Sequence, residues 1–449
     1  MMLYGFIKYI NPGWYFNLLP KRELPYFLDY ELLSDQDKAL VAIDEHYSSW
    51  KISKIDAAYQ GFQKGLISSD GLSITDLSHT STLKDNYRFI KKYFSGIWVY
   101  YIFFIRILSL HNPVMELIGL MSSLKVKRID IFKTTAEQSG FDKFDSELIK
   151  SKTYVSIIIP TLNRYPYLKD VLADLEMQTY SHFEVIIIDQ TEPFNQSFYH
   201  NWRLNLRVEF QEEKALWLAR NKAIKMSKGE YILLYDDDSR VDKDWVCNHL
   251  KCLDYYKADI SSGVSLSVVG AKIPRHYSFF RWSEQIDTGN VMIKKKVFSS
   301  IGLFDRQFEK QRQGDGEFGL RAYLFGFRNI SNPRSSRIHL KVSEGGLRQM
   351  GSWDGFRPKK WLAPRPIPSV LYLLRKYFDN KAAIYCLLIS VPPSLLPYRF
   401  KKNKLIFLGG IIITLVASPV VVFSVSRSWF RASKMLKEGA KIEFVDFTK

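Results

Sequence analysis

The sequence predicts an α/β protein with a parallel sheet in its middle third and mainly helical regions on either side. Short β-branched runs, Tyr154–Pro160, Glu184–Asp189 and Tyr231–Tyr235, alternate with helical stretches, which is the pattern of strands joined by crossover helices. With 449 residues, 46% of them hydrophobic, the chain can build more than one core. We expect three regions: residues 1–150, 151–345 and 346–449.

The N-terminal region, residues 1–150, is predicted to be a helical accessory region of unknown role. A helix start is expected at Ser34–Asp37, which has an N-cap residue followed by acids in the first turn. The run Ile97–Ile105 is uncharged and aromatic, and Arg106 then interrupts it. This run is too short to span a bilayer, so we expect a buried helix rather than a membrane contact.

The central region places its most polar residues where predicted strands end. Thr161–Arg164 follows the first strand, Asp189 ends the second and Asp236–Asp238 ends the third. Between the first two strands, one face of the predicted helix Tyr167–Gln178 is apolar. Because ligands bind at the carboxyl ends of strands in open α/β sheets, this edge is the predicted active site.

The C-terminal region, residues 346–449, is basic and apolar. Leu405–Val425 contains 21 residues without a charge, which as a helix would be roughly 30 Å long, the thickness of a hydrocarbon core. Ala382–Tyr398 is also uncharged but carries prolines, which suggests an interfacial, re-entrant or broken segment. We expect membrane-associated helices here, the alternative for Leu405–Val425 being a buried core helix. Basic residues on both sides of that segment leave its orientation open.

Charge and cysteine content narrow the choice of partners. Lys and Arg number 64 against 46 for Asp and Glu, a net charge of +18. Such a charge suits an anionic partner: nucleic acid, an anionic lipid surface or a phosphorylated substrate. Three cysteines, and no apparent secretory leader, argue against a disulfide framework and for a reducing compartment.

The three consecutive carboxylates Asp236–Asp238 have a chemical meaning of their own. Side by side at a strand end they repel one another, so a nearby cation is expected to compensate. A hard divalent cation binds carboxylate oxygens, and it can neutralise a diphosphate leaving group. The alternative is a solvated turn in which one of these residues caps a helix.

Five segments together resemble the successive motifs of family 2 glycosyltransferases, in the family's order. These segments are VSIIIPTLNR (155–164), EVIIIDQT (184–191), LARNKAIKMSKGEYILLYDDD (218–238), TGNVMIKKKVFSSIGLFD (288–305) and GDGEFGLRAYLFGF (314–327). The resemblance covers roughly residues 150–345. It implies a Rossmann-like, GT-A type nucleotide-diphospho-sugar transferase core and inversion at the anomeric carbon.

The resemblance also assigns the donor site. The loop Pro160–Arg164 would line the nucleotide, Asp189 would hydrogen-bond a base, commonly uracil, and Arg220 would lie near the donor. In the Asp-x-Asp motif, Asp238 would bind Mn²⁺ or Mg²⁺, and His339 would complete the metal shell. The nucleotide contacts implied in this way are Pro160, Thr161, Asn163, Arg164, Asp189, Arg220, Asp236 and Asp237, and the metal ligands are Asp238, Asp236 and His339.

For the acceptor side, the resemblance assigns Asp315 as the catalytic base. An attacking hydroxyl must lose its proton, and a positioned carboxylate can take it. Gly314 stands where relatives often have another acid. Glu317 and Arg321 form an i,i+4 pair that supports the helix or orients the base. The stretch around Trp282, Gly289 and Asn290 would border the acceptor, although Trp282 is equally consistent with a core residue.

The function expected from these observations is metal-dependent, inverting transfer of a hexosyl group from a nucleotide sugar, such as a UDP-sugar, to a glycan or lipid-linked acceptor. The setting would be cell-surface polysaccharide assembly at the cytoplasmic face of the cell membrane. A processive polysaccharide synthase is an alternative, but several spanning helices and a Gln-x-x-Arg-Trp motif are not apparent. A non-catalytic basic binding protein would gain nothing from Asp189, Asp238 and Asp315, so nucleic acid is not expected as a partner.

Overall fold

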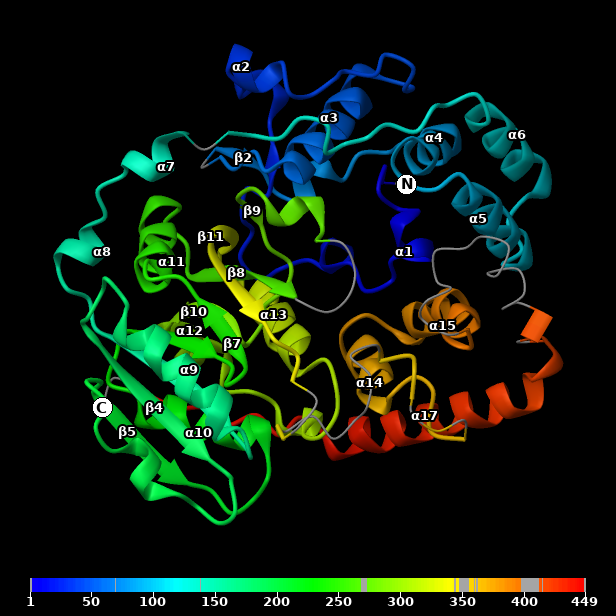
Figure 1. Cartoon of the computed structure of the whole chain (residues 1–449). Coiled ribbons are helices and arrows are strands. Elements are labelled where there is room, and N and C mark those ends of the chain that lie inside the picture. The colour runs from blue at the N-terminus through cyan, green and yellow to red at the C-terminus, as the bar shows by residue number, and fades with distance from the viewer. Residues whose placement is uncertain are drawn as a thin grey trace. The chain divides into compact units, whose positions relative to one another are not determined.

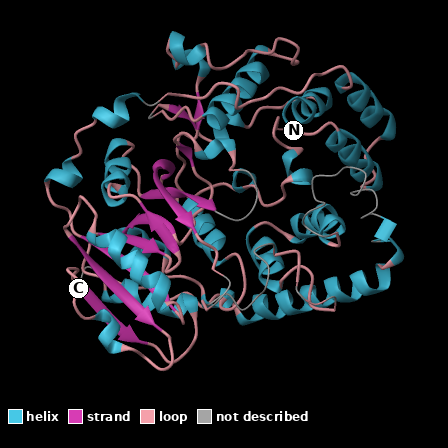
Figure 2. Ribbon diagram, viewed as in Figure 1, coloured by secondary structure: helices cyan, strands magenta, loops and turns pink. Residues whose placement is uncertain are grey.

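The computed structural model divides the chain into two units. Unit 1 comprises residues 1–137 and 374–417, and unit 2 comprises residues 138–373 and 418–449. The residues described are 2–68, 70–137, 139–267, 273–342, 345–346, 355–358, 360, 362–396, 412–413 and 415–447. Figure 1 traces the chain, and Figure 2 separates helices from strands. The predicted third region, residues 346–449, is thus shared between the two units.

Unit 1 is mainly helical. Its core is aromatic: Tyr4 packs against Phe27, Tyr59 and Phe89, with ring centroids 5.3–5.7 Å apart. Local signals set its helix ends, since Thr82 and Asp85 form a capping box and Ser34 caps the helix predicted at that position. The helices are α1 Ile7–Ile10, α2 Asp35–Lys38, α3 Trp50–Lys64, α4 Leu83–Tyr93, α5 Ile97–Leu108, α6 Pro113–Ser123 and α15 Asn380–Ser394, and β1 Phe27–Leu28 pairs with β2 Gly71–Leu72.

The helix predicted over Ile97–Ile105 forms as α5, but the expectation that it is buried is wrong for its outer face. Val99 and Ile102 are buried, whereas Ile97, Tyr100 and Phe104 are exposed. A run without charged residues predicts a helix with an apolar surface. It does not predict how many faces of that helix are covered by other elements.

Unit 2 is built on a nine-stranded mixed sheet with the order β5-β4-β3-β6-β10-β8-β11-β7 and β9 paired to β11. The three predicted strands are confirmed as β3, β4 and β6, which are neighbours and parallel. The sheet is not wholly parallel, because β10 runs antiparallel between β6 and β8. The strands are β3 Val155–Thr161, β4 Phe183–Asp189, β5 Leu206–Phe210, β6 Tyr231–Tyr235, β7 Ser239–Val241, β8 Ile260–Ser267, β9 Arg281–Trp282, β10 Asn290–Lys294 and β11 Asn329–His339.

Helices cover this sheet, which confirms the α/β class. The predicted apolar face of α9, Leu168, Val171, Leu172 and Leu175, is buried. Helix α10 packs on β3 and β4, and α11 packs on β8 and β11. The helices are α7 Ser139–Lys143, α8 Glu147–Lys150, α9 Tyr165–Glu176, α10 Leu216–Met226, α11 Trp245–Tyr255, α12 Lys295–Ile301, α13 Gly314–Phe325 and α17 Ser418–Glu438, and α14 Pro368–Tyr377 crosses the boundary of the two units.

The C-terminal segment returns to unit 2 after residues assigned to unit 1. Following α17, the backbone amide of Leu303 donates to the carbonyl of Glu443 at 2.8 Å, and that of Arg306 donates to the carbonyl of Lys441 at 3.2 Å. The Lys441 amide donates to the Asp305 carboxylate at 2.8 Å. Residues 441–443 therefore pair with the loop that precedes α13.

Only part of the candidate membrane span 405–425 lies within the described residues. Residues 405–411 and 414 lie outside the described residues, and α17 begins within the rest of the segment. One face of α17, which includes Val421, Ser428 and Met435, is buried. Over the described residues, the structure contains no helix of the length and apolarity that crossing a bilayer requires. In the second candidate segment, α15 continues through Pro392 and Pro393.

Candidate active site

The predicted polar edge forms a pocket in unit 2. In the parallel register of β3 and β4, Thr161 stands opposite Asp189, and Asp236–Asp238 follow β6 on the other side of β3. The pocket encloses about 140 Å³. It is lined by Pro160, Leu162, Arg164, Leu216, Trp217, Arg220, Asp236, Asp237, Asp238, Asp287, Thr288, Lys310, Gln311, Arg312, Gln313, Asp315 and Gly346.

Asp236 is held between two buried arginines. Arg220 Nη2 lies 2.9 Å from one carboxylate oxygen, and Arg337 Nη1 lies 2.7 Å from the other. Arg337 also pairs with Asp287 at 2.9 Å. Gly289 makes room for this arrangement, because a Cβ at that position would lie only 2.5 Å from Arg337 Cζ. Gly289 therefore contributes by leaving room for the ion pair between Asp236 and Arg337.

The other two acids of the motif share Arg164. Its Nη1 lies 2.8 Å from Asp237 and 3.1 Å from Asp238. Burial raises the pKa of Asp237 to about 6, although Arg164 opposes this shift. Burial also acts to raise the pKa of Asp238, but His339 and Arg164 outweigh it and leave that pKa below its ordinary value. Adjacent carboxylates thus differ in proton affinity, and Asp238 is the one favoured as an anion.

Asp236, Asp238 and His339 come together as predicted. One potential ligand atom from each of them lies within 4.8 Å of the other two. His339 Nε2 is buried and lacks a hydrogen-bond partner among the described residues, and it lies 3.3 Å from an Asp238 oxygen. Two carboxylates and an imidazole nitrogen suit Mn²⁺ or Mg²⁺, with the nitrogen favouring Mn²⁺. The grouping of these three ligand atoms makes the residues fit a divalent cation.

The predicted nucleotide loop is anchored on both sides. Thr161 donates its hydroxyl hydrogen to Asp237 at 2.8 Å, and the Asn163 amide donates to the Thr191 hydroxyl at 2.8 Å. Asn163 has a φ of 56°, in the left-handed region that asparagine tolerates. The Gly346 amide donates to the carbonyl of Leu162 at 2.8 Å, so residues 345–346 lie against the loop.

Asp189 lies at the expected strand end, but tyrosines cover its carboxylate. The hydroxyls of Tyr165 and Tyr199 donate to one oxygen at 2.7 and 2.8 Å, and the Thr191 amide donates to the other at 2.9 Å. Asp189 is fully buried and is not among the residues that line the pocket. A base that bonded to the oxygen shared by Tyr165 and Tyr199 would have to displace one of their hydroxyls. The sequence offered no signal for this, because Tyr199 comes from a short 3₁₀ turn ten residues away.

Asp315 lies in the first turn of α13 and lines the pocket. Burial raises the pKa of its carboxyl, and the negative charge of Asp287 adds to the shift. The preceding residue, Gly314, faces the ring of Trp217: a Cβ there would lie 2.5 Å from Trp217 Cε2 and closer still to Cζ2. Relatives often have an acid at the position of Gly314. In this chain the indole of Trp217, from α10, occupies the space that such a side chain would need.

Glu317 and Arg321 form a buried ion pair, with Arg321 Nε 2.9 Å from the carboxylate. Arg321 also donates to the carbonyls of Ile301 and Leu303, the second at 2.9 Å. The pair therefore ties α13 to the loop after α12, which agrees with the supporting role considered from the sequence.

Two predicted acceptor residues lie elsewhere. Trp282 is buried in β9, with the guanidinium of Arg328 5.3 Å from its ring centroid. The Asn290 side chain accepts from Trp245 Nε1 at 2.8 Å and donates to two backbone carbonyls. Both side chains are absent from the pocket lining, which includes Asp287 and Thr288 from the same stretch. The sequence alone did not distinguish a tryptophan that packs in the core from one that faces a sugar.

Comparison with known proteins finds one family model and several relatives that match part of the chain. The family model for glycosyl transferase family 2 matches residues 156–308. The chain is 24% identical over 164 residues to the glycosyltransferase GlyA of Streptococcus pneumoniae, covering 35% of this chain and 22% of GlyA. It is 29% identical over 129 residues to the poly(ribitol-phosphate) β-N-acetylglucosaminyltransferase TarS of Staphylococcus aureus, covering 27% of this chain and 22% of TarS.

A third relative is the putative glycosyltransferase EpsH of Bacillus subtilis, 28% identical over 210 residues, which are 42% of this chain and 60% of EpsH. The matches therefore span less than two thirds of the length of each of these relatives. Among solved structures, S. aureus TarS 1–349 in complex with UDP-GlcNAc has a TM-score of 0.43 and 17% identity over 66% of this chain and 98% of that one.

Proposed function

We propose, from the match of residues 156–308 to family 2 glycosyltransferases, that the chain catalyses metal-dependent, inverting transfer of a sugar from a nucleotide-sugar donor. The observation that carries the proposal is one pocket lined by both Asp315 and the cluster Asp236–Asp238. A proton acceptor and a candidate cation site thus border the same small volume.

The donor end would be held by the acids and the arginine around them. Asp236, Asp238 and His339 would bind Mn²⁺ or Mg²⁺, which when bound supplies positive charge to neutralise the diphosphate leaving group. Arg164 adds a cation to the same wall of the pocket. Pro160, Thr161 and Asn163 lie on the adjoining loop, where the nucleoside part of the proposed donor, a UDP-sugar, would lie. UDP-GlcNAc is bound by one structural neighbour.

At the acceptor end, Asp315 would act as the base. Its carboxylate takes the proton of an acceptor hydroxyl while that oxygen forms a bond to the anomeric carbon. The bond from the anomeric carbon to the diphosphate breaks on the opposite face, so the nucleoside diphosphate leaves and the configuration inverts. A raised pKa suits this role, since a base with a higher pKa binds the proton more strongly once the hydroxyl is in place.

The proposed acceptor is a glycan or a lipid-linked glycan in cell-surface polysaccharide assembly, at the cytoplasmic face of the membrane. The names of relatives support the polysaccharide part of this proposal: TarS is named as a poly(ribitol-phosphate) β-N-acetylglucosaminyltransferase, and a 29% identical relative is named for teichuronic acid biosynthesis. The net charge of +18 is compatible with an anionic polymer or lipid carrier.

The test uses the full chain, a panel of nucleotide sugars, and thermal shift and donor turnover measured with and without Mn²⁺. Asp315→Asn should keep the midpoint shift that donor binding causes, but lower turnover roughly 10²-fold or more because the proton acceptor is lost. Asp238→Ala should lose the effect of Mn²⁺ on both readouts. Asp35→Asn, on the exposed helix α2, is the matched control and should behave as wild type. Equal turnover in wild type, Asp238→Ala and Asp315→Asn would refute the assignment.

A further inference from the structure

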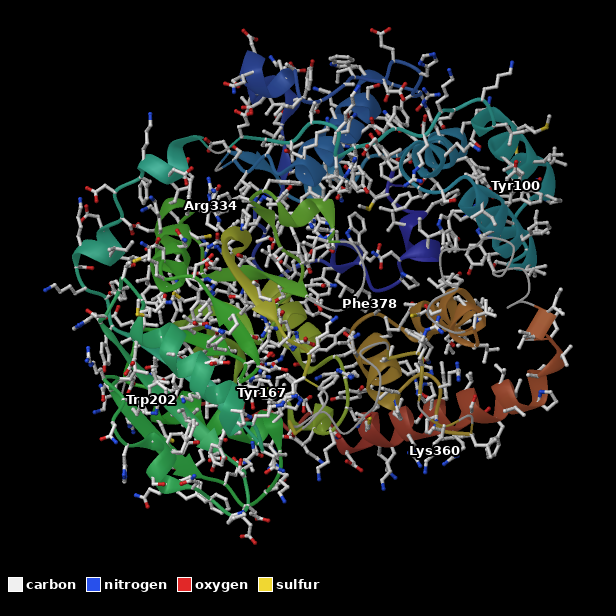
Figure 3. All side chains as sticks on the ribbon, viewed as in Figure 1. Tyr100, Tyr167, Trp202, Arg334, Lys360 and Phe378 are labelled. Carbon is white, nitrogen blue, oxygen red and sulfur yellow. The ribbon has the colours of Figure 1, made fainter. Side chains whose placement is uncertain are left out.

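Helices α5 and α6 of unit 1 form a hairpin whose outer face is apolar and exposed. They pack side by side and are joined by residues 109–112 (Figure 1). Tyr100, labelled in Figure 3, belongs to this face. Its large apolar side chains are 43–94% exposed: Ile97, Tyr100, Phe104, Leu108, Leu110, Val114, Met115, Leu117, Ile118, Met121 and Leu124. Clusters of exposed apolar side chains on soluble proteins mark interaction sites.

The charged residues of the hairpin are sorted to its inner face. Between residues 97 and 124 the sequence contains two charges, Arg106 and Glu116. Both are buried and pair at 2.7 Å. Glu116 also accepts from the Tyr87 hydroxyl at 2.8 Å, and Arg106 donates to the Tyr9 hydroxyl at 3.2 Å. The inner face is thus bonded to the body of unit 1, and the outer face carries no charge.

Close packing on the same inner face keeps the hairpin in place. A Cβ at Gly119 would lie 2.7 Å from the Tyr87 ring, so α6 can approach α4 only because this position is a glycine. Val99, Ile102 and Leu120 are buried beside it. The outer face is therefore the surface of a fixed element, which can present its apolar side chains together.

The basic residues that follow the hairpin indicate which kind of partner binds this surface. Lys125, Lys127 and Arg128 follow α6 directly and are exposed. An uncharged apolar face edged by bases matches acyl chains edged by anionic headgroups. A second copy of this chain would also have a net charge of +18, and repulsion between like net charges opposes self-association.

Neither helix of the hairpin is long enough to span a bilayer. With 12 and 11 residues, α5 and α6 are roughly 18 and 17 Å long, about half the thickness of a hydrocarbon core. We propose that the α5–α6 hairpin inserts its outer face into one leaflet of a membrane containing anionic lipid, and so anchors unit 1 without spanning the bilayer. This proposal does not depend on the sugar transfer proposed for unit 2.

The test is flotation of the full chain with vesicles of phosphatidylcholine, alone or with phosphatidylglycerol. The triple variant Phe104→Glu/Leu108→Glu/Leu110→Glu alters exposed side chains, so its thermal midpoint should match that of wild type. It should bind vesicles at least roughly tenfold more weakly, because three charged side chains replace apolar side chains that would be buried in the membrane. The matched control Leu19→Glu/Leu32→Glu/Met177→Glu changes side chains that are 64–72% exposed outside the hairpin and should float like wild type.

A second variant separates the electrostatic part. Lys125→Gln/Lys127→Gln/Arg128→Gln should lose roughly tenfold or more of its binding to vesicles with phosphatidylglycerol, but little of its binding to phosphatidylcholine. Flotation of the hairpin variant equal to that of wild type would overturn the proposal. So would a wild-type dimer in solution that the hairpin variant turns into a monomer, because a second copy would then cover the face. Donor turnover, measured on all variants, shows separately whether the proposed sugar transfer holds.

Discussion

Replacing Gly314 with alanine adds one methyl group at the most crowded point beside the predicted base. The new carbon would lie 2.5 Å from Trp217 Cε2, whereas carbon atoms in good contact are about 3.5–4.0 Å apart. The indole cannot simply move away. Its Nε1 donates to the carbonyl of Phe308 at 3.0 Å, and its ring packs against Phe304 at an interplanar angle of 32° with centroids 5.0 Å apart. The ring must therefore shift by about 1 Å and give up part of this bonding.

The size of the effect follows from these contacts. Overpacking of a filled interior costs about 1–3 kcal/mol, and loss of the indole hydrogen bond adds about 1 kcal/mol. We expect Gly314→Ala to lower the free energy of unfolding by about 2–4 kcal/mol, a fall in Tm of roughly 4–16 °C for a unit of this size. Turnover should fall as well, because Trp217 and Asp315 both line the pocket.

The same helix offers a matched control two residues on. A Cβ at Gly316 would meet only the end of the Gln313 side chain, at 2.8 Å, and that amide can rotate away. Gly316→Ala should therefore leave Tm unchanged or raise it, since alanine favours a helix interior by about 0.5–1 kcal/mol over glycine. Thermal unfolding and donor turnover of both variants check the contrast.

A double variant completes the test. Trp217→Ala removes the ring and is itself costly, at about 3–5 kcal/mol. If the clash is the cause, Gly314→Ala should add little to Trp217→Ala, so the two costs should not be additive. Additive costs, or a Gly314→Ala protein as stable and active as Gly316→Ala, would refute the reasoning.

Two further predictions concern pH and the buried ion pair. The ratio kcat/KM should fall as the pH drops through the pKa of Asp315, which burial places above the ordinary aspartate value, because the protonated carboxyl cannot accept a proton. Asp287→Asn should move this acid limb to lower pH by removing a negative charge near Asp315. Glu317→Ala should destabilise the protein by about 3–5 kcal/mol, because it leaves Arg321 buried without its carboxylate. Glu317→Gln should cost less in the same thermal unfolding measurement.

Local patterns in the sequence predicted the parts of the fold that depend on local chemistry. Strands β3, β4 and β6 and the buried face of α9 follow from β-branched runs and from helical spacing. Parallel neighbours then bring Thr161, Asp189 and Asp236–Asp238 to one edge. The grouping of His339 with Asp236 and Asp238 was also expected, but from the family's motif order, since no local periodicity links β11 to β6.

The parts that were not predicted depend on partners distant in sequence. Arg337 is 101 residues from Asp236, yet it completes the ion pair that Gly289 accommodates. Trp217 is 97 residues before Gly314, and neither residue signals the other. The antiparallel β10 and the tyrosine cover of Asp189 likewise arise from tertiary contacts that override local signals. For α5 the sequence indicated a helix, but which of its faces is exposed depends on α4 and α6.

The pairing of residues 441–443 with the loop 303–306 affects when unit 2 can be completed during synthesis. The ribosome makes residues 1–137 of unit 1 and then the whole sheet, next residues 374–417 of unit 1, and only afterwards the segment that bonds to Leu303, Asp305 and Arg306. Domains usually fold as they emerge, N-terminal parts first. Here the loop that leads into α13, and so to Asp315, forms its hydrogen bonds to residues 441–443 only after some 140 more residues have been made. A nascent chain that stopped after α15 would carry every pocket residue but lack this last support.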